Sequence, residues 1–552
     1  MTATAAATPT AAKAASVVLL TLAMGQFLMT LDTSVMNVSI ATVAKDVDTT
    51  VTGIQGAITL YTLVMASLMI IGAKVGAMIG RKRAFAIGAV IYGCGSFTTS
   101  IAPNLPVLLF GWSFLEGVGA ALILPAIVAL VAGNFPVERR PAAYGLVAAA
   151  GAIAVATGPL IGGIFTTYFS WRWVFAGEVL IVFAILILSR RIADAPPETR
   201  PKLDLVGALL SAMGLGVLVF GVLRSGEWGW IKPRPEGVSW WGLSPTIWLV
   251  LGGLGILWLF LQWETHRQER GKEPLVQPAM LKNKQLAGGL TMFFFQYLAQ
   301  AGLFFVVPLY LSVALGLSAL ATGARLTPLS ITLLAAAIGI PRLRPNANPR
   351  RVVRLGLLAL LAGTVVLLGA LDVDAGPEIV LLPMLLIGLG IGALASQLGS
   401  VTVSAVPDDQ APEVGGIQNT ATNLGASLGT ALAGALLIAA LSTAFLSNIQ
   451  NSDAIPSRVK SEAQANLAGG VPFVSDADLE QALDDANVHS QAADAAVDAY
   501  GKARITGLRS ALAILALMNV IALFLTHRIP KVQPGSEAAA ATAGAPAPAA
   551  RG

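Results

Sequence analysis

Long apolar segments that carry almost no charge recur along the whole chain. The stretch from Thr49 to Ala73 contains no Asp, Glu, Lys or Arg, and it exceeds the roughly 20 residues that a helix needs to cross a bilayer. No segment alternates apolar and polar residues in the way that a membrane β-strand does. The pattern therefore predicts membrane-spanning helices.

We predict fourteen such spans, and hence an all-α integral membrane protein. The spans are 16–40, 53–72, 84–102, 106–130, 142–166, 172–190, 204–223, 245–264, 287–312, 324–340, 352–371, 379–401, 415–445 and 505–528. The first span is too long for a removable signal peptide and lacks its small-residue cleavage site. Low-complexity composition predicts a disordered cytoplasmic N-terminus over 1–15 and a disordered cytoplasmic tail over 529–552.

The composition supports a membrane protein. Of 552 residues, 55% are hydrophobic and 12% are charged, and the mean hydropathy is +0.74. Soluble proteins average about 25% charged residues, so a soluble multi-domain enzyme is excluded. The single cysteine, Cys94, excludes a disulfide framework.

The basic residues predict the orientation in the membrane, because Lys and Arg concentrate on the cytoplasmic side. With a cytoplasmic N-terminus, most of them fall in cytoplasmic segments; examples are Arg81, Lys82, Arg83, Arg139, Arg140, Arg190, Arg191, Arg350 and Arg351. The net charge of +5 is therefore a topology signal, and we expect no nucleic-acid partner. The loop 402–414 departs from the rule, because it carries Asp408, Asp409 and Glu413 without Lys or Arg.

An even number of spans places both termini in the cytoplasm and the segment 446–503 outside. This segment is rich in Ala, Asp and Glu, with a partly helical pattern. It is interpreted either as a polar spacer between the last two spans or as a substrate gate or partner site.

Four short motifs follow one another along the first half of the chain. Span 1 contains Leu31-Asp32-Thr33-Ser34-Val35-Met36-Asn37-Val38, and span 2 is followed by Gly80-Arg81-Lys82-Arg83. Span 5 contains Gly145 and ends in Gly158-Pro159-Leu-Ile-Gly162-Gly163, which favours a bent, closely packed helix. Span 6 is entered through Trp171-Arg172-Trp173, an aromatic and cationic anchor for the membrane interface.

In this order and spacing the motifs resemble those of the major facilitator superfamily, and most closely its fourteen-span drug:proton antiporter branch. The resemblance covers roughly residues 16–528. It implies the major facilitator fold, with two six-helix bundles at 16–190 and 287–528, the second including the segment 446–503. A linker at 191–286 would carry two extra central helices. Such bundles rock around a site at the membrane midplane.

The chain departs from the family pattern at several positions. Ala77 stands where the motif after span 2 usually has Asp, and Ala154 replaces the middle glycine of the span 5 motif. Ser113 and Glu116 stand where span 4 usually has Arg and Gln, and Glu178 stands where Asn is common. A proton step built on the usual span 4 arginine therefore cannot be carried over.

Three acids lie inside predicted spans and away from their end residues, where a charge is costly and marks a functional candidate. Asp32 lies in span 1, Glu116 near the middle of span 4, and Glu178 in the outer third of span 6. A carboxyl group in apolar surroundings can exchange a proton near neutral pH, so these three are the proton-coupling candidates. The structural alternatives are a packing contact for Glu116 and an ion pair with Arg172 for Glu178.

Polar side chains at helical spacing supply candidates for a substrate cavity. Residues four apart share a helix face, and their alternative role is hydrogen bonding between helices. Arg325, near the outer end of span 10, lines the cavity or snorkels to the surface. The cavity candidates are Asn37, Gln296, Gln300, Arg325, Asn419 and Asn423.

The predicted function is proton-coupled efflux, by antiport and alternating access, of hydrophobic or amphipathic small molecules such as drugs or antibiotics across a bacterial cytoplasmic membrane. One alternative is export of an endogenous lipid, siderophore or metabolite. Another is a non-transporting receptor or scaffold with a degenerate transporter fold, suggested by Ala77 and Ser113. We find no Walker sequence, metal-ligand cluster or nucleophile–base pattern. We therefore expect that the protein is not an enzyme, uses the proton gradient, and needs no cofactor or metal. We also expect a monomer in the lipid bilayer.

Overall fold

The structure is a computed structural model that describes residues 9–135, 139–194, 203–234, 238–407, 410–452, 455–457, 460–461, 471–486, 488 and 490–533. Much of both predicted disordered ends, 1–8 and 534–552, therefore lies outside the described residues. The same holds for Asp408 and Asp409 of the acidic loop and for parts of the segment 446–503.

The described residues form an all-helical bundle, as predicted. Thirteen of the helices in these ranges are long and apolar enough to cross a membrane. The 20-residue helix α3 (Arg81–Ser100) occupies the place of the remaining predicted span. It is less apolar because it begins with Arg-Lys-Arg and contains several Gly, Ser and Thr residues. Short connections begin many helices with Ser, Thr or Asn caps: Thr50, for example, accepts a hydrogen bond from the Gly53 amide.

The first bundle contains the helices of the predicted spans 1–6. Span 4 is one continuous rod whose middle, η1, is π-helical, and α1 packs against α6 while α3 packs against α5 and α7. The elements are α1 (Pro9–Asp46), α2 (Val51–Ile79), α3, α4 (Leu105–Leu108), η1 (Leu109–Glu116), α5 (Gly117–Asn134), α6 (Arg140–Tyr168) and α7 (Arg172–Ser189).

The second bundle contains the helices of the predicted spans 9–14. Within it α11 packs against α15, α14 against α12 and α13, and α18 against α15. The elements are α11 (Lys284–Leu309), η3 (Tyr310–Ala314), α12 (Ala319–Leu343), α13 (Pro349–Ala370), η4 (Pro377–Val380), α14 (Leu381–Val403), α15 (Ala411–Asn451), α18 (Ser490–Leu525) and η6 (Thr526–Arg528).

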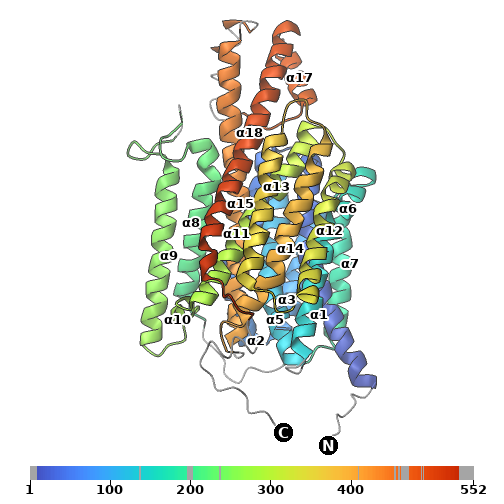
Figure 1. The fold of residues 1–552 in the computed structure, drawn as a ribbon, viewed down its shortest axis with the longest axis vertical. Coiled ribbons are helices and arrows are strands. Elements are labelled where there is room, and N and C mark those ends of the chain that lie inside the picture. Colours follow the sequence, from blue (N-terminus) through green and yellow to red (C-terminus); the bar gives the residue numbers. More distant parts are fainter. Residues whose placement is uncertain are drawn as a thin grey trace, which may run out of the picture.

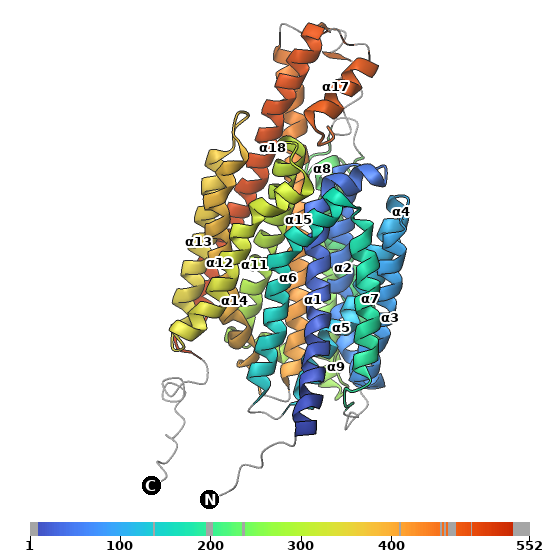
Figure 2. The ribbon, with the colours of Figure 1, turned by 90° about the vertical axis from the view of Figure 1, so that its right-hand side faces the viewer.

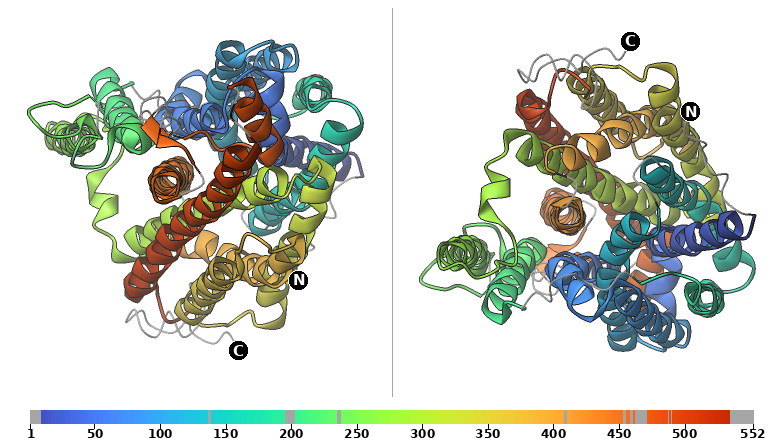
Figure 3. Two further views of the ribbon diagram at one scale, coloured as in Figure 1. Left: turned by 90° about the horizontal axis from the view of Figure 1, so that it is seen from above. Right: turned by 90° about the horizontal axis from the view of Figure 1, so that it is seen from below.

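The two extra helices are central in the sequence but peripheral in space. Helices α8 (Leu205–Trp228) and α9 (Pro245–Glu269) stand to one side of the bundles (Figure 1), and the short α10 (Pro278–Leu281) follows them. Seen along the bundle axis, α9 lies outermost and α8 lies between it and the rest (Figure 3). The inner helix, α8, packs on α2 of the first bundle and on α15 of the second. The insert therefore touches both bundles on one side.

Both ends of the described chain lie at the same end of the molecule, which we call the lower end after its place in Figure 1. At the opposite, upper end α15 and α18 project beyond the other helices, with α17 (Asp476–Asp485) beside them (Figure 2). The 41 residues of α15 span about 60 Å, twice a bilayer core. The projection has its own apolar contacts, because the rings of Phe445 and Tyr500 meet edge to face at 5.3 Å.

Candidate functional site

The three acids predicted within the spans meet inside the first bundle. Asp32 comes from α1, Glu116 from the end of η1 and Glu178 from α7, and one carboxyl oxygen of each lies within 4.8 Å of the other two. Each of these residues is at most 1% exposed. We call these three residues the carboxyl cluster. They are far apart in the sequence, which is why spacing alone predicted no ligand cluster.

Each carboxyl group is held through one oxygen only. The Trp112 indole N–H donates to Asp32 Oδ1 at 2.7 Å, and the Thr99 hydroxyl donates to Glu116 Oε1 at 3.1 Å. The Glu178 Oε2 atom accepts hydrogen bonds; its donors are the Ser96 hydroxyl at 3.1 Å and the Tyr92 hydroxyl at 3.3 Å. The second oxygens have no hydrogen-bond partner among the described residues; they are Asp32 Oδ2, Glu116 Oε2 and Glu178 Oε1.

The π-helical segment η1 and the neighbouring helix α2 build the wall beside Asp32. The rings of Trp112 and Tyr61 stack at 5.1 Å with an interplanar angle of 8°. Ser113 donates to the Ala57 carbonyl at 2.8 Å, which ties η1 to α2. Irregular helical turns of this kind often accompany functional sites. Sequence reasoning missed Trp112, Tyr61 and Tyr92, because an aromatic residue in an apolar span reads as ordinary core.

The predicted alternative of a Glu178–Arg172 ion pair is wrong. Arg172 turns to the upper end, where its guanidinium pairs with Asp46 at 3.2 Å and donates to the Ala102 carbonyl at 2.8 Å. No ion pair among the described residues includes a member of the carboxyl cluster. Three ionised carboxylates this close, in apolar surroundings, would repel one another strongly. Protons or a bound cation must therefore balance their charge.

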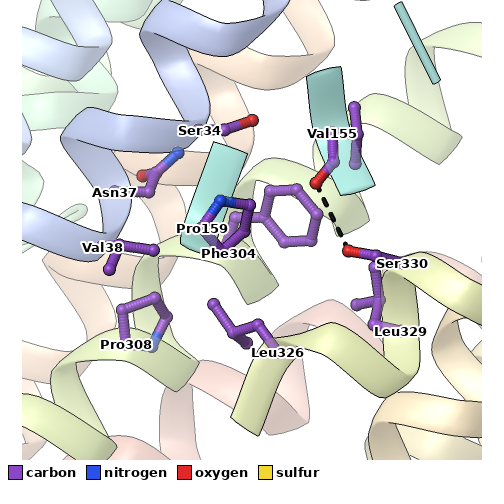
Figure 4. Close-up of a pocket in the computed structure, with 10 residues that line it drawn as sticks. All are labelled: Ser34, Asn37, Val38, Val155, Pro159, Phe304, Pro308, Leu326, Leu329 and Ser330. Atoms are coloured by element: carbon purple, nitrogen blue, oxygen red, sulfur yellow. Dashed lines mark hydrogen bonds between the residues drawn. The ribbon is translucent and has the colours of Figure 1, made fainter. Parts of the chain in front are cut away.

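A small cavity between the two bundles lies on the other side of α1. Ser34, Asn37 and Val38 of α1 face Val155 and Pro159 of α6, and residues of α11 and α12 complete the wall (Figure 4). The cavity holds about 10 Å³, room for one water molecule. A drug-sized molecule therefore does not fit in this conformation.

The other predicted cavity residues do not line this space. Gln296 is buried with its carbonyl oxygen unpartnered, while Gln300 is half-buried. The Asn423 amide donates to the Asn419 carbonyl of its own helix at 2.8 Å. Arg325 is exposed on the surface of α12 and does not line this cavity.

The Gly/Pro segment of α6 makes the close contacts that its composition predicted. Gly158 and Gly162 face Ser34 and Val35 of α1, while Gly163 faces the backbone of α12 at Ala319 and Leu320. In return, the Pro159 carbonyl lies where a side chain on Gly323 of α12 would be. The Thr167 hydroxyl also accepts the Leu320 amide at 3.0 Å. The upper ends of α6 and α12 are thus in contact, whereas Gly145 near the lower end has open space around it.

A carboxylate from a distant part of the chain, that of Asp194, contacts the motif after span 2. Gly80 joins α2 to α3 with φ of 100°, a conformation that disfavours other residues. The Asp194 carboxylate lies against it and accepts the Lys82 amide at 3.3 Å, and Lys82 Nζ donates to the Arg190 carbonyl at 3.0 Å. Asp194, which follows α7, therefore places a carboxylate at the N-terminus of α3. The position where the family motif usually has Asp is Ala77 in this chain. Arg81 is half-buried and Arg83 exposed beside it.

A connecting segment, residues 273–277, holds the two bundles together at the lower end. Lys74 of α2 pairs with Glu273 at 3.3 Å, and the backbone amide and side-chain amide of Gln277 both donate to Glu413 of α15 at 3.2 Å. The buried Glu264 of α9 accepts the Leu275 and Val276 amides. The acid Glu413, which looked like an exception in a cytoplasmic loop, is therefore half-buried in this contact.

The α2–α15 contact continues toward the upper end. The Gln55 amide of α2 donates to the Thr430 carbonyl at 3.2 Å, and Ser427 donates to the Thr59 carbonyl at 3.0 Å. Gln55 was missed, although a glutamine in an apolar span is a signal for such a contact.

Comparison with known proteins identifies relatives over most of the chain. The family model described as Major Facilitator Superfamily matches residues 22–430. Puromycin resistance protein pur8 of Streptomyces alboniger is 31% identical over 417 residues, 74% of this chain and 78% of its own. The Probable actinorhodin transporter of Streptomyces coelicolor is 28% identical, over 79% and 74% of the two chains. Multidrug resistance protein Stp of Mycobacterium tuberculosis is 24% identical, over 80% and 79%.

Solved structures show the same fold. A bacterial homologue of the human lysosomal transporter Spinster, inward-facing and unoccupied, aligns with TM-score 0.57 and 14% identity over 95% of this chain and 98% of its own. Peptide transporter POT in complex with sulfate aligns with TM-score 0.56 and 15% identity, over 94% and 96%. At these identities the likeness concerns the fold alone.

Proposed function

The chain belongs to the Major Facilitator Superfamily, and on this premise we propose that it exports hydrophobic or amphipathic small molecules, antibiotics among them, by alternating access coupled to proton entry. The resemblance of the motifs to the drug:proton antiporter branch points to this class. So do the names of its relatives, which describe antibiotic transport and resistance. The lower end is the cytoplasmic side in this proposal, because the basic loops lie there.

The observation that carries the proton coupling is the carboxyl cluster. Asp32, Glu116 and Glu178 come from three helices, have no basic partner among the described residues, and each present one unpartnered oxygen. Carboxyl groups in this setting change the local charge by a full unit when they take up or lose a proton. A membrane potential of 100 mV adds about 2.3 kcal/mol for each proton that enters.

Helix α1 connects the two parts of the proposed mechanism. Its Asp32 belongs to the carboxyl cluster, while its Ser34 and Asn37 face the cavity between the bundles. When the upper contact of α6 and α12 is open, proton uptake from outside removes charge repulsion among the carboxyl groups and releases the substrate. The protonated bundles then rock closed at the upper end as α1 shifts against α5 and α7. Proton loss to the cytoplasm resets the site for rebinding.

The test uses everted membrane vesicles that contain the protein and an imposed proton gradient. Puromycin serves as a first test compound because a relative carries that resistance. Addition of a transported compound should dissipate the gradient in wild-type vesicles, as reported by a pH-sensitive dye, but not with Glu116→Gln or Asp32→Asn. Equal proton movement in all three proteins would reject the cluster as the coupling site. Uptake of compound without proton movement would retain export and reject the coupling.

A further inference from the structure

The carboxyl cluster has the arrangement of a cation site as well as that of a proton site. One oxygen of each carboxyl group is oriented by a donor from the surrounding helices. The other oxygen of each is buried and unpartnered. Donors of this kind typically orient carboxylates that hold a metal ion from the other side.

A second observation points to a ligand in the same place. The Tyr61 hydroxyl is fully buried next to the Asp32 carboxyl, and it too has no hydrogen-bond partner within the described chain. Its ring is fixed by stacking on Trp112. Four helical elements, α1, α2, η1 and α7, thus each place a buried, unpartnered oxygen atom in the carboxyl cluster or beside it, and burying so many polar atoms without partners is costly.

The spacing of the oxygens fits an ion of the size of Ca²⁺ or Na⁺. Ca²⁺ binds oxygen at about 2.3–2.6 Å, so ligands on opposite sides of such an ion lie up to about 5 Å apart. The three carboxyl oxygens lie within 4.8 Å of one another, so a single ion can contact all three. The donors are oxygens only, without His or Cys, which favours hard cations over transition metals.

The titratable groups around the carboxyl cluster carry negative charge or none, and none of those in the described residues is basic. The titratable groups that face it are the three acids themselves, Tyr61 of α2 and Tyr92 of α3. Arg172 lies on the same helix as Glu178, but its guanidinium forms an ion pair with Asp46. Protein groups in the described part of the chain therefore supply no positive charge to this site.

We propose that Asp32, Glu116 and Glu178 form a binding site for one hard, oxygen-preferring cation, Ca²⁺ or Na⁺, which protons displace. Protons and the cation compete because both occupy the same carboxyl oxygens, so cation binding is strongest in alkaline buffer. The binding rests on this geometry and not on the transport proposed above. Where that transport operates, the cation is an alternative coupling ion.

The test measures thermal unfolding and tryptophan fluorescence of the purified full chain, in alkaline buffer with choline chloride as the only added salt. Ca²⁺ is titrated in one arm, and Na⁺ with a chelator in the other. Mg²⁺ serves as a comparison, because its shorter bonds and strict octahedral geometry fit this spacing less well. A bound cation raises the Tm in a saturable manner. A saturable rise in one arm identifies which ion binds.

Two kinds of variant separate a specific site from general effects. Asp32→Asn, Glu116→Gln and Glu178→Gln should each abolish the saturable response, whereas Asp498→Asn, an exposed acid of the projection, should keep it. Trp112→Phe leaves all three carboxyls in place but removes the donor that orients Asp32. It should weaken the apparent affinity about 10- to 100-fold, which remains measurable if an acid variant fails to fold.

No response of the wild-type protein to either ion would overturn the proposal, and so would a response that survives in the acid variants. The outcome is separate from that of the vesicle experiment. A protein that moves protons with substrate but binds no cation contradicts only this inference, and a protein that binds the cation but moves no substrate contradicts only the proposed export.

Discussion

Asp32 and Asn37 lie on different faces of the same helix. Five residues correspond to about 140° of rotation in an α-helix. Asp32 meets the Trp112 indole inside the first bundle, while Asn37 lines the cavity between the bundles. A change of charge at Asp32 is therefore one helix diameter from the space that must open for a substrate, and α1 is the element that connects them.

Neutral replacement of Glu116 should separate stability from transport. Glutamine keeps an oxygen that accepts the Thr99 hydrogen bond but removes the charge. We expect the free energy of unfolding to stay within about 1 kcal/mol of wild type or to rise, since repulsion from the other two acids is lost. Export should be abolished. Thermal unfolding measures the stability, and drug accumulation in cells measures the export. Glu227→Gln, which changes a half-exposed acid, is the control. Export at the wild-type rate by Glu116→Gln would contradict the proton-coupling role of Glu116.

A larger residue at Gly323 should open the upper contact of the bundles. Any side chain there meets the Pro159 carbonyl of α6, which is backbone and cannot move aside. In Gly323→Leu we expect the distance between spin labels on Tyr168 and Ala324, both exposed, to shift to longer values. The label pair is placed in a Cys94→Ser background.

Gly339→Leu is the matched control for this experiment. It lies on the same helix with no atom near its Cβ position, so the distance should not change. If both variants give the wild-type distribution, the contact at Gly323 does not hold the upper ends together.

A disulfide should lock the lower ends of α2 and α15. The Cβ position of Gly416 lies 3.5 Å from Ala73 Cβ, inside the range of about 3.5–4.5 Å found in disulfides. Ala73→Cys with Gly416→Cys, without Cys94, should cross-link under mild oxidation. Export should then stop and should return after reduction, because the proposed cycle separates these ends.

The single variant Ala73→Cys controls for oxidation and should keep its export. Full export by the cross-linked protein would show that the lower ends of α2 and α15 stay together throughout transport. Residues 273–277 would then hold the two helices together permanently and not only in one conformation.

Gly80→Ala should destabilise the turn between α2 and α3. The position has φ of 100° with ψ of 136° and lies against the Asp194 carboxylate, so a side chain costs about 1–3 kcal/mol in backbone strain and disturbs this contact. We expect a lower Tm. Gly145→Ala, in a helix with open surroundings, should be neutral or stabilising by about 0.4–1 kcal/mol. Equal Tm values for the two variants would show that the backbone conformation and the Asp194 contact at Gly80 do not require glycine.

The sequence by itself determined the helices, the family and the identity of the buried acids. These are local properties: a run of about 20 apolar residues must be helical in a bilayer, since its backbone groups find no other partners there. A charge within such a run stands out for the same reason, as Asp32, Glu116 and Glu178 did.

Only the tertiary structure decided which of these residues meet. Glu178 meets Asp32 and Glu116 instead of Arg172, and Asp194 contacts the turn at Gly80 and Lys82. These contacts depend on how closely the helices approach and which faces they turn inward, and small residues at the helix contacts help to set both. Gln277 reaches Glu413 because the connecting segment folds back between α2 and α15. Such contacts join residues up to hundreds of positions apart, and helical periodicity carries no information about the face of a distant helix.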